Sequence, residues 1–274
     1  DHRDLHYPLR RQRQMCIRDS PLAAEVSKVD LKNLTDSEVS QIKTSFLEHS
    51  VLLFKDQDLL PDELKDISTI WGQPQIHPVF KGLDGYPEII EINNYGEKYH
   101  TNAHWHSDVT FEETPPDATL LYSLEVPDSG GDTLFSNQYL AFEELDEGLK
   151  SDLEGKRAIH SNIGVLMLTG GDTSKAKTVE HPIFREHPET GRKALYVTEA
   201  FVKSIHGLES EESQDILQKL YSHASQENFL YRHKWTKGDL LIWDNRSVQH
   251  FAEHGYGDKV RRMHRITTSG SKPF

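Results

Sequence analysis

The sequence predicts a mainly β fold, a sandwich or barrel of short strands with helical cover. Two observations support this class. From about residue 88 onward, short apolar runs rich in β-branched and aromatic residues alternate with turn residues. Segments with helical periodicity are few by comparison, and no internal repeat is visible. The length of 274 residues suits one large domain or two small ones.

The first part of the chain mixes helix and strand signals. Thr35 and Glu38 form a capping box, after which apolar side chains recur at helical spacing. The run VLLF at 51–54 is typical of a buried strand. Pro61 is placed to open a second helix. The apolar face of that helix carries Leu64, Ile67, Ile70 and Trp71.

Strand signals dominate the rest of the chain. The expected strands are EIIEI (88–92), ATLLYSLEV (118–126), DTLFS (132–136), ALYVT (194–198), DLLIWD (239–244), SVQHFA (247–252) and RRMHRITTS (261–269). Two helices interrupt them, one starting near Ser136 and one running from about Ser210 to Gln226. The segment from about Asn162 to Val179 is rich in glycine and polar residues, so we expect a loop there that acts as a mobile lid.

The composition argues against several classes of protein. Asp and Glu number 44 against 31 Lys and Arg, a formal net charge of −13, so we expect neither a nucleic-acid nor an anionic-membrane surface. The single cysteine, Cys16, excludes an intramolecular disulfide and favours a reducing, cytoplasmic location. No apolar run approaches the roughly 20 residues of a membrane helix.

The first twenty residues differ from the rest because they are basic and polar and lack a clear period. The stretch RQRQMCIRDS is more like translated adapter sequence than protein. We therefore predict a disordered or non-native leader at 1–20 and a single domain at 21–274. A functional basic arm is the alternative interpretation.

The stretch HWHSDVTF places His104, His106 and Asp108 on alternate positions, which in an extended strand point to one face. Two histidines and one carboxylate on one face of an octahedral metal ion leave positions open for a co-substrate and O₂. His106 and Asp108 can supply two ligands, and a third must come from far away in the sequence. His250, within WDNRSVQHFA, is a candidate. Taken alone, an HxD pair is weak evidence, and a single strand histidine is more often structural.

The segment RRMHRIT carries a second pattern. On a strand, Arg261 and Arg265 share one face and lie roughly 13 Å apart. Two arginines that face one interior are costly unless each meets an anion. A surface strand with solvated charges explains the pattern equally well.

Several segments, in this order, resemble the TauD/TfdA family of Fe(II)/2-oxoglutarate-dependent dioxygenases. They are IHPVF (76–80), WHSDVTFEETPP (105–116), GGDTLF (130–135), ALYVTEAF (194–201), GDLLIWDNRSVQH (238–250) and RRMHRITTSG (261–270). The resemblance runs from about residue 21 to the C-terminus. It implies a double-stranded β-helix, or cupin-like jelly roll, with iron at one mouth. It also implies His106, Asp108 and His250 as the catalytic metal ligands, with His104 as a neighbour.

The same resemblance assigns the co-substrate and substrate contacts. It implies that Arg261 and Thr133 hold the distal carboxylate of 2-oxoglutarate, a task for which the planar guanidinium fork is suited. For the primary substrate it implies the contacts His77, Phe80, Asn102, Phe111, Phe201 and Arg265. Arg265 and His77 would hold the anionic end. Phe80 stands where the taurine enzyme has a tyrosine, so a hydroxyl donor is lost and taurine itself is in doubt.

The implied activity is hydroxylation of a small anionic substrate with O₂, Fe(II) and 2-oxoglutarate. A taurine-like alkanesulfonate would release sulfite and an aldehyde. The alternatives are an alkylsulfate or aryloxyalkanoate dioxygenase of the same family, a non-catalytic cupin-like metal-binding protein, and a zinc hydrolase. The resemblance also implies a homo-oligomer, a dimer or tetramer, without nucleic-acid or membrane partners.

Overall fold

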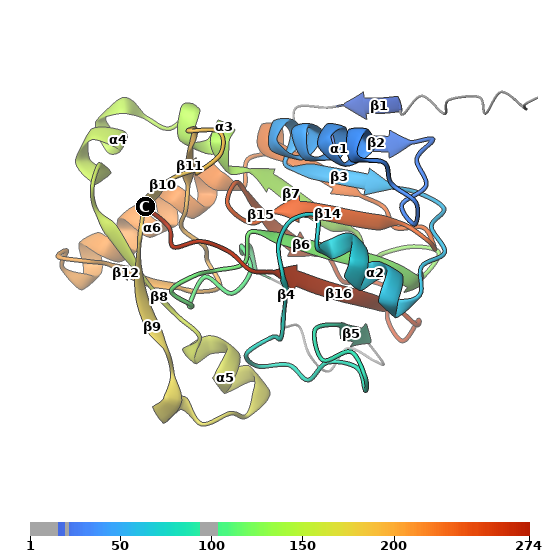
Figure 1. Ribbon diagram of the computed structural model, residues 1–274. Coiled ribbons are helices and arrows are strands. Elements are labelled where there is room, and N and C mark those ends of the chain that lie inside the picture. The colour runs from blue at the N-terminus through green and yellow to red at the C-terminus, as the bar shows by residue number, and fades with distance from the viewer. Residues whose placement is uncertain (1–15, 20–21, 94–103) are drawn as a thin grey trace, which may run out of the picture.

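The computed structural model describes residues 16–19, 22–93 and 104–274. Its centre is a pair of facing β-sheets, with helices packed on the outer face of the larger sheet and around the smaller one (Figure 1). This architecture confirms the expected jelly roll with helical cover.

The larger sheet follows the order β1 (Cys16–Asp19), β2 (Ala23–Ser27), β3 (Val51–Phe54), β14 (Leu240–Asp244), β6 (Ala118–Glu125), β16 (Arg262–Thr268) and β4 (Pro74–Gln75). A further strand, β5 (Ile90–Asn93), pairs with β16. The pairing of β2 with β3 is parallel, and the other pairs in this sheet are antiparallel within the described residues. Strands far apart in the sequence therefore lie side by side, as a jelly roll requires.

The smaller sheet has the order β13 (Leu230–His233), β7 (Thr133–Asn137) and β15 (Val248–Ala252). Two more sheets extend this side: β12 (Val202–Ile205), β8 (Arg157–Ser161) and β9 (Thr178–Pro182), and the pair β10 (Phe184–Glu186) and β11 (Lys193–Leu195). The helices are α1 (Asp36–His49), α2 (Pro61–Ser68), α3 (Gln138–Glu143), α4 (Glu147–Leu153), α5 (Ile163–Thr169) and α6 (Ser210–Ala224). Two 3₁₀ turns are η1 (Thr173–Lys175) and η2 (Glu227–Phe229).

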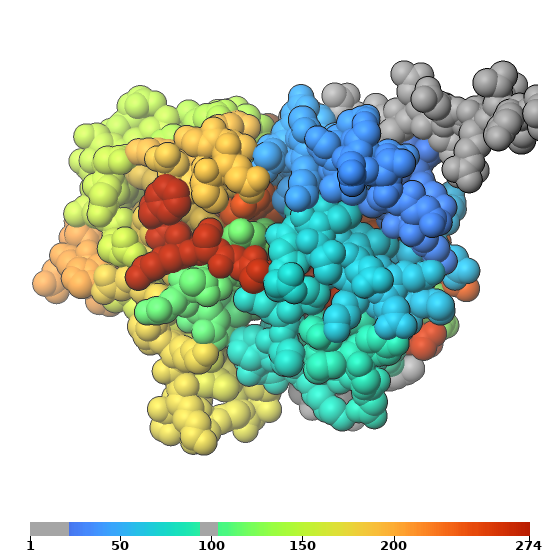
Figure 2. All heavy atoms as spheres, viewed as in Figure 1, coloured from blue at the N-terminus to red at the C-terminus, as the bar shows by residue number. Residues whose placement is uncertain are grey.

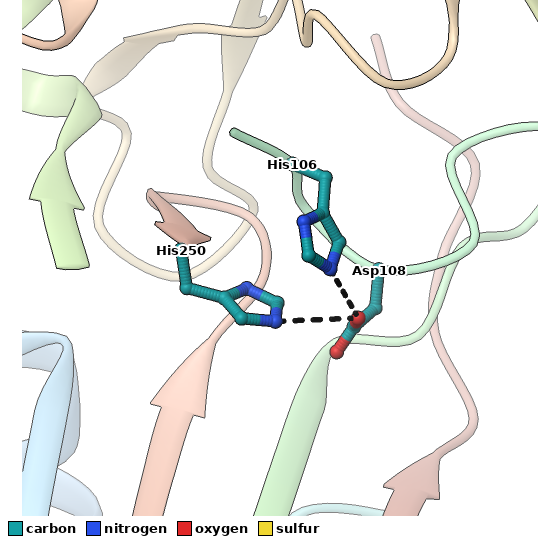
Figure 3. Close-up of side chains that lie close together, drawn as sticks. All are labelled: His106, Asp108 and His250. Carbon is teal, nitrogen blue, oxygen red and sulfur yellow. Dashed lines mark ion pairs between the residues drawn. The ribbon is translucent and has the colours of Figure 1, made fainter. Parts of the chain in front are cut away.

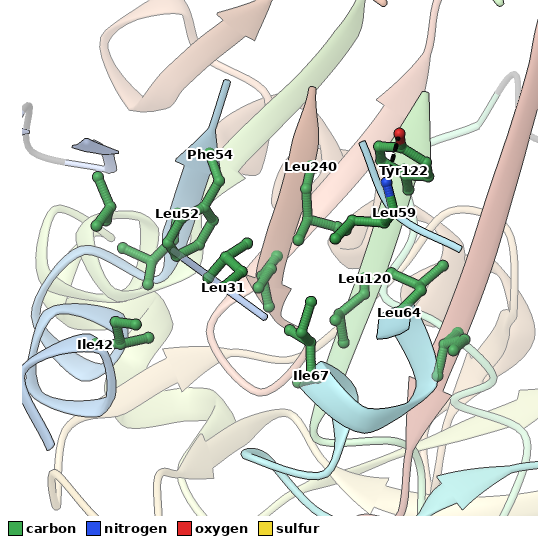
Figure 4. Close-up of a cluster of buried hydrophobic side chains, with 14 of the residues drawn as sticks. Leu31, Ile42, Leu52, Phe54, Leu59, Leu64, Ile67, Leu120, Tyr122 and Leu240 are labelled. Atoms are coloured by element: carbon green, nitrogen blue, oxygen red, sulfur yellow. Dashed lines mark hydrogen bonds between the residues drawn. The ribbon is translucent and has the colours of Figure 1, made fainter. Parts of the chain in front are cut away.

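Strand alternation divides the core into two layers. In β14, Leu240 and Ile242 join the cluster beneath α1 and α2, whereas Leu241 and Trp243 face the smaller sheet. Figure 4 shows the outer layer, where Leu52 and Phe54 of β3 and Leu240 of β14 meet side chains of both helices. Each fully buried leucine or isoleucine contributes roughly 1.5–3 kcal/mol to folding. The continuous apolar runs of these strands follow from burial on both faces.

The capping box is present at the start of α1. The Thr35 hydroxyl accepts from the Glu38 backbone N–H at 3.3 Å, and the Thr35 N–H donates to the Glu38 carboxylate at 2.9 Å. Pro61 opens α2 as expected, and that helix ends at Ser68. Ile70 and Trp71 therefore lie beyond it, although both still pack against the core.

The strand expected at 132–136 is confirmed as β7, and the helix expected near Ser136 begins at Gln138, where the Asn137 side chain caps the N–H groups of the first turn. Two expectations about elements are wrong. The strand expected at 194–198 is present only as β11, which ends at Leu195. The segment 162–179 is not an irregular loop, because it contains α5 and η1. Gly170 caps the C-terminus of α5 in the left-handed conformation, at φ 69°.

The predicted leader at 1–20 is described only at Cys16–Asp19, which pairs with β2 in an antiparallel register. The boundary between leader and domain at residue 20 stays a prediction. Within the described ranges, no helix combines the length and the apolar character needed to cross a membrane.

Candidate metal centre and substrate pocket

Two distant segments are joined at the mouth of the jelly roll. The backbone N–H of His106 donates to the carbonyl of His250 at 3.1 Å, and the His250 N–H donates to the His106 carbonyl at 2.7 Å. This isolated antiparallel bridge brings the HxD segment against β15. The third candidate ligand is thereby placed beside the other two.

His106, Asp108 and His250, here called the metal triad, converge on one point (Figure 3). The Nε2 atom of each histidine lies 3.7 Å from Oδ1 of Asp108. The three possible ligand atoms lie within 4.8 Å of one another, and all three residues are buried. This set of two imidazoles and one carboxylate suits a divalent metal with open coordination positions.

The surroundings of His106 and His250 favour the neutral form of each imidazole ring. The Nδ1 atom of His106 lies 2.8 Å from the carbonyl oxygen of His104, to which it can only donate, so Nε2 carries the free lone pair. Burial lowers the pKa of His106, and it lowers the pKa of His250 well below the ordinary value. Neutral imidazole is the form that binds a metal. The His104 ring itself pairs with Glu199 at 3.3 Å, outside the metal triad.

A buried hydrogen-bond chain fixes the carboxylate of Asp108. The Thr119 hydroxyl donates to Oδ2 at 2.6 Å, and the Asn245 amide donates to that hydroxyl oxygen at 2.8 Å. The Asn245 carbonyl oxygen in turn accepts from the Trp243 indole at 3.0 Å. Thr119 and Asn245 were not predicted from the sequence, because their positions within or beside buried strands carry no distinguishing local pattern. Trp243, fully buried behind His250, belongs to the core.

Arg265 supplies positive charge beside this carboxylate. Its Nη2 lies 2.7 Å from Oδ1 of Asp108. Burial alone would raise the pKa of Asp108, but the charge of Arg265, together with the hydrogen bond from Thr119, holds the pKa below its ordinary range. Among the described residues, Nε of Arg265 has no hydrogen-bond partner. The guanidinium therefore keeps a donor to offer an anion.

His77 faces the same space as a neutral donor. Its Nδ1 accepts from the backbone N–H groups of Val79 and Phe80, both at 3.1 Å, which places the ring proton on Nε2. Burial, followed by the charge of Arg265, lowers the pKa of His77 to about 3. At neutral pH the ring can donate one hydrogen bond while adding no charge.

A cavity of about 420 Å³ opens beside the metal triad. The sequence-predicted residues on its wall are His77, Phe80, His106, Asp108, Phe111, Phe201 and Arg265. The apolar wall that sequence analysis missed consists of Val79, Val109, Val165, Met167, Leu168 and Ala200. The folded chain thus places a cation and a neutral donor at the metal end of a largely apolar cavity.

Arg261 and Thr133 lie together but do not line this cavity. The Thr133 hydroxyl accepts from the Trp235 indole at 2.9 Å, and the Arg261 guanidinium lies 5.9 Å from the ring centre of the same tryptophan. Arg261 is 5% exposed, and no described carboxylate forms an ion pair with it. Burial lowers its pKa. A buried guanidinium without a counter-charge is a site for an anion. Asn102 lies outside the described residues.

Comparison with known proteins identifies the family. The model described as "Taurine catabolism dioxygenase TauD, TfdA family" matches residues 16–267. The chain belongs to this family. The family assignment confirms the resemblance found in the sequence, and with it an oxidoreductase that uses Fe(II), 2-oxoglutarate and O₂. A non-catalytic metal-binding protein and a zinc hydrolase are thereby set aside.

Similar proteins include enzymes with different named activities. An alkylsulfatase of Acinetobacter baylyi is 35% identical over 91% of this chain and 82% of its own length. An alpha-ketoglutarate-dependent sulfate ester dioxygenase of Pseudomonas putida is 33% identical over 92% of this chain and 88% of its own. The crystal structure of a taurine dioxygenase from Burkholderia xenovorans superposes with a TM-score of 0.83 at 34% identity, covering 94% of this chain and 90% of the other.

Proposed function

We propose that His106, Asp108 and His250 hold the Fe(II) of this dioxygenase. The buried donor set, the neutral histidines and the fixed carboxylate support this assignment. Bound iron, together with 2-oxoglutarate, supplies the oxidising power that hydroxylates a C–H bond, while 2-oxoglutarate becomes succinate and CO₂. The protein's own task is to bind, orient and exclude water.

Arg261 and Thr133 bind the distal carboxylate of 2-oxoglutarate. The guanidinium is buried without a partner carboxylate, and the Thr133 hydroxyl, whose oxygen already accepts from Trp235, keeps its own proton to donate. An anion placed between them would receive charge-assisted hydrogen bonds. The buried position of both side chains explains why a free anion, rather than a surface ion pair, is the expected partner.

Arg265 and His77 bind the anionic head of the primary substrate, and Phe111 and Phe201 enclose the carbon next to it. These two rings lie 5.2 Å apart, and the Phe201 ring meets the His106 ring edge-on at 6.1 Å. The head of a sulfonate or a sulfate ester matches one guanidinium and one N–H donor. Hydroxylation beside the head yields an unstable product, which releases sulfite from a sulfonate or sulfate from a sulfate ester.

Phe80 bears on which organic anion is used. It lines the cavity without a hydroxyl, so a substrate that needs a hydrogen bond at this position loses it. We therefore propose an organic sulfonate or sulfate ester other than taurine. An aryloxyalkanoate, whose carboxylate would occupy the same head position, is the second candidate, and its product glyoxylate distinguishes it.

The test is turnover by anaerobically reconstituted enzyme exposed to air with a panel of alkanesulfonates, alkyl sulfates and aryloxyacetates. Sulfite, sulfate and glyoxylate are assayed beside succinate. We expect one sulfur product, formed only when 2-oxoglutarate is present. Glyoxylate with no sulfur product would move the assignment to carboxylate substrates, and succinate formation that no panel member stimulates would refute the proposed substrate class.

The cytoplasmic location and the homo-oligomer also remain proposals. The single cysteine supports a reducing compartment. Light scattering coupled to size-exclusion chromatography tests the oligomer, since a mass of one 31.5 kDa chain would contradict it.

A further inference from the structure

We propose that the organic part of the substrate is an extended apolar chain whose far end binds against α5 (Ile163–Thr169), and this inference rests on the proposed function. The head would lie at Arg265, the reacting carbon beside Phe111 and Phe201, and the remainder of the chain along Val165, Met167 and Leu168. The ligand class is an unbranched alkyl sulfate or sulfonate.

The size and polarity of the cavity indicate that the substrate extends beyond its anionic head. Its volume of about 420 Å³ falls within the roughly 300–1,000 Å³ of pockets that bury drug-sized ligands. At the ~30 Å³ that one water occupies in the liquid, such a space holds about a dozen non-hydrogen atoms. The ion, its co-substrate and the anionic head take up the metal end of this space, and the part along α5 is left for the rest of the substrate.

The amino-acid composition of α5 indicates that the far end of the substrate is apolar. Its sequence, IGVLMLT, is almost entirely apolar, yet none of its residues is buried. Met167 is 65% exposed and Leu168 is 54% exposed. The amphipathic helices α1, α2 and α6, by contrast, all bury part of their apolar face. Within the described chain, Met167 and Leu168 of α5 therefore present apolar surface that no protein side chain covers.

The same residues connect α5 to the reaction site. Val165 packs against the buried cluster of Val109, Phe111 and Phe201, which borders the metal triad. Met167 and Leu168 lie on the wall of the cavity that His106 and Asp108 also line. Because the apolar face is continuous with the metal end of one cavity, the occupant it fits is the substrate that enters this cavity. A second protein would leave the inner cavity unfilled.

The way in which α5 and η1 are attached to the rest of the protein would let this wall of the cavity adjust to a ligand. The backbone N–H of Lys177 donates to the side chain of Asn162 at 2.8 Å. This hydrogen bond joins the two ends of the segment that contains α5 and η1. Beyond this tie the segment projects from the body of the molecule, as Figures 1 and 2 show at the lower edge. Its base is thus fixed, and its tip has few neighbours.

The experiment measures kcat/KM for ethyl, butyl, hexyl, octyl and decyl sulfate, and for the matching sulfonates, with wild-type enzyme and with Met167→Ser/Leu168→Ser. We expect kcat/KM of the wild type to rise roughly two- to fourfold per added methylene until the cavity is filled. In the double variant the ratio of octyl to ethyl should fall at least tenfold. Leu60→Ser is the matched control, because Leu60, the N-cap residue before α2, is 65% exposed and lies outside the cavity.

A second readout does not depend on turnover. Anaerobic hydrogen exchange of the Mn(II)-loaded protein is followed with and without octyl sulfate, and the α5 amides should become protected with the wild type and not with the double variant. A flat dependence on chain length with α5 unprotected would overturn the inference while leaving the proposed function intact. Protection without sulfate or sulfite release would support the binding site and count against the proposed reaction. Protection that follows protein concentration instead would make α5 a contact between copies and overturn the inference.

Discussion

The hydroxyl of Thr119 donates a 2.6 Å hydrogen bond to Oδ2 of Asp108, while Oδ1 of the same carboxylate faces both histidines of the metal triad. One oxygen is therefore held by the Thr119 hydroxyl, and the other faces the two histidines and lies 2.7 Å from Nη2 of Arg265. Thr119 is fully buried in β6, and its own oxygen accepts from Asn245. The carboxylate is oriented before any ion arrives.

Removing this hydroxyl should weaken metal binding. In Thr119→Val the shape of the side chain is kept and the donor is lost, so we expect metal affinity to fall about 10- to 100-fold. Anaerobic titration with Mn(II), followed by calorimetry, measures the change. Thr119→Ser keeps the donor and is the control. Equal affinities of the Val variant and the wild type would show that Thr119 does not position the ligand.

Replacing Arg261 should affect 2-oxoglutarate far more than iron. Arg261→Ala removes the buried guanidinium proposed to bind the distal carboxylate, so we expect the KM for 2-oxoglutarate to rise by at least tenfold, the effect of about 1.4 kcal/mol of lost charge-assisted bonding. Succinate formation is followed while each component is varied in turn. Parallel shifts in the requirements for Fe(II) and 2-oxoglutarate would contradict the assigned role.

The lowered pKa of His77 predicts a specific pH behaviour. Because the folded pKa of about 3 lies below the ordinary 6.5, His77 stays neutral above about pH 4 in the native protein. The His77→Gln substitution should therefore remove no ionisation near 6.5 from the kcat/KM profile between pH 5.5 and 8. An ionisation near 6.5 that this substitution removes would show that the charged imidazolium binds the substrate.

The same shift has a consequence for stability. Between about pH 3 and 6.5 the unfolded chain binds a proton at His77 that the folded chain does not, so His77 lowers the free energy of unfolding as the pH falls through this window. Urea unfolding at several pH values should show a weaker decline in His77→Gln than in the wild type. A steeper decline in the variant would contradict the neutral assignment.

The extent of the sequence prediction follows from which signals are local. The apolar strand runs and the capping box at Thr35 are local signals, and most of these strands and the capping box are confirmed. The neighbourhood of His106 and His250 depends on a backbone bridge between distant segments, so the residue pattern alone left His250 ambiguous, and the family resemblance was needed. Thr119 could not be found, because nothing near it in the sequence separates a ligand-orienting threonine from a core one.

The α5 segment shows the opposite difficulty. Its glycines and polar flanks favoured a loop, but the apolar run 165–168 lies within a helix, Ile163–Thr169, that Gly170 caps. A short helix that leaves its apolar residues exposed gains little from packing, and such helices are poorly encoded by amphipathic periodicity. Its role as a cavity wall became visible only once the cavity was in place.

The most direct test of the metal assignment is succinate formation by Asp108→Ala beside the wild type, with Fe(II), 2-oxoglutarate and O₂ supplied and folding checked by circular dichroism. Asp108 provides the only carboxylate of the metal triad. Loss of its oxygen ligand should abolish turnover in a folded protein that binds Mn(II) much more weakly. Succinate formed at the wild-type rate would contradict the assignment of His106, Asp108 and His250 as the iron site.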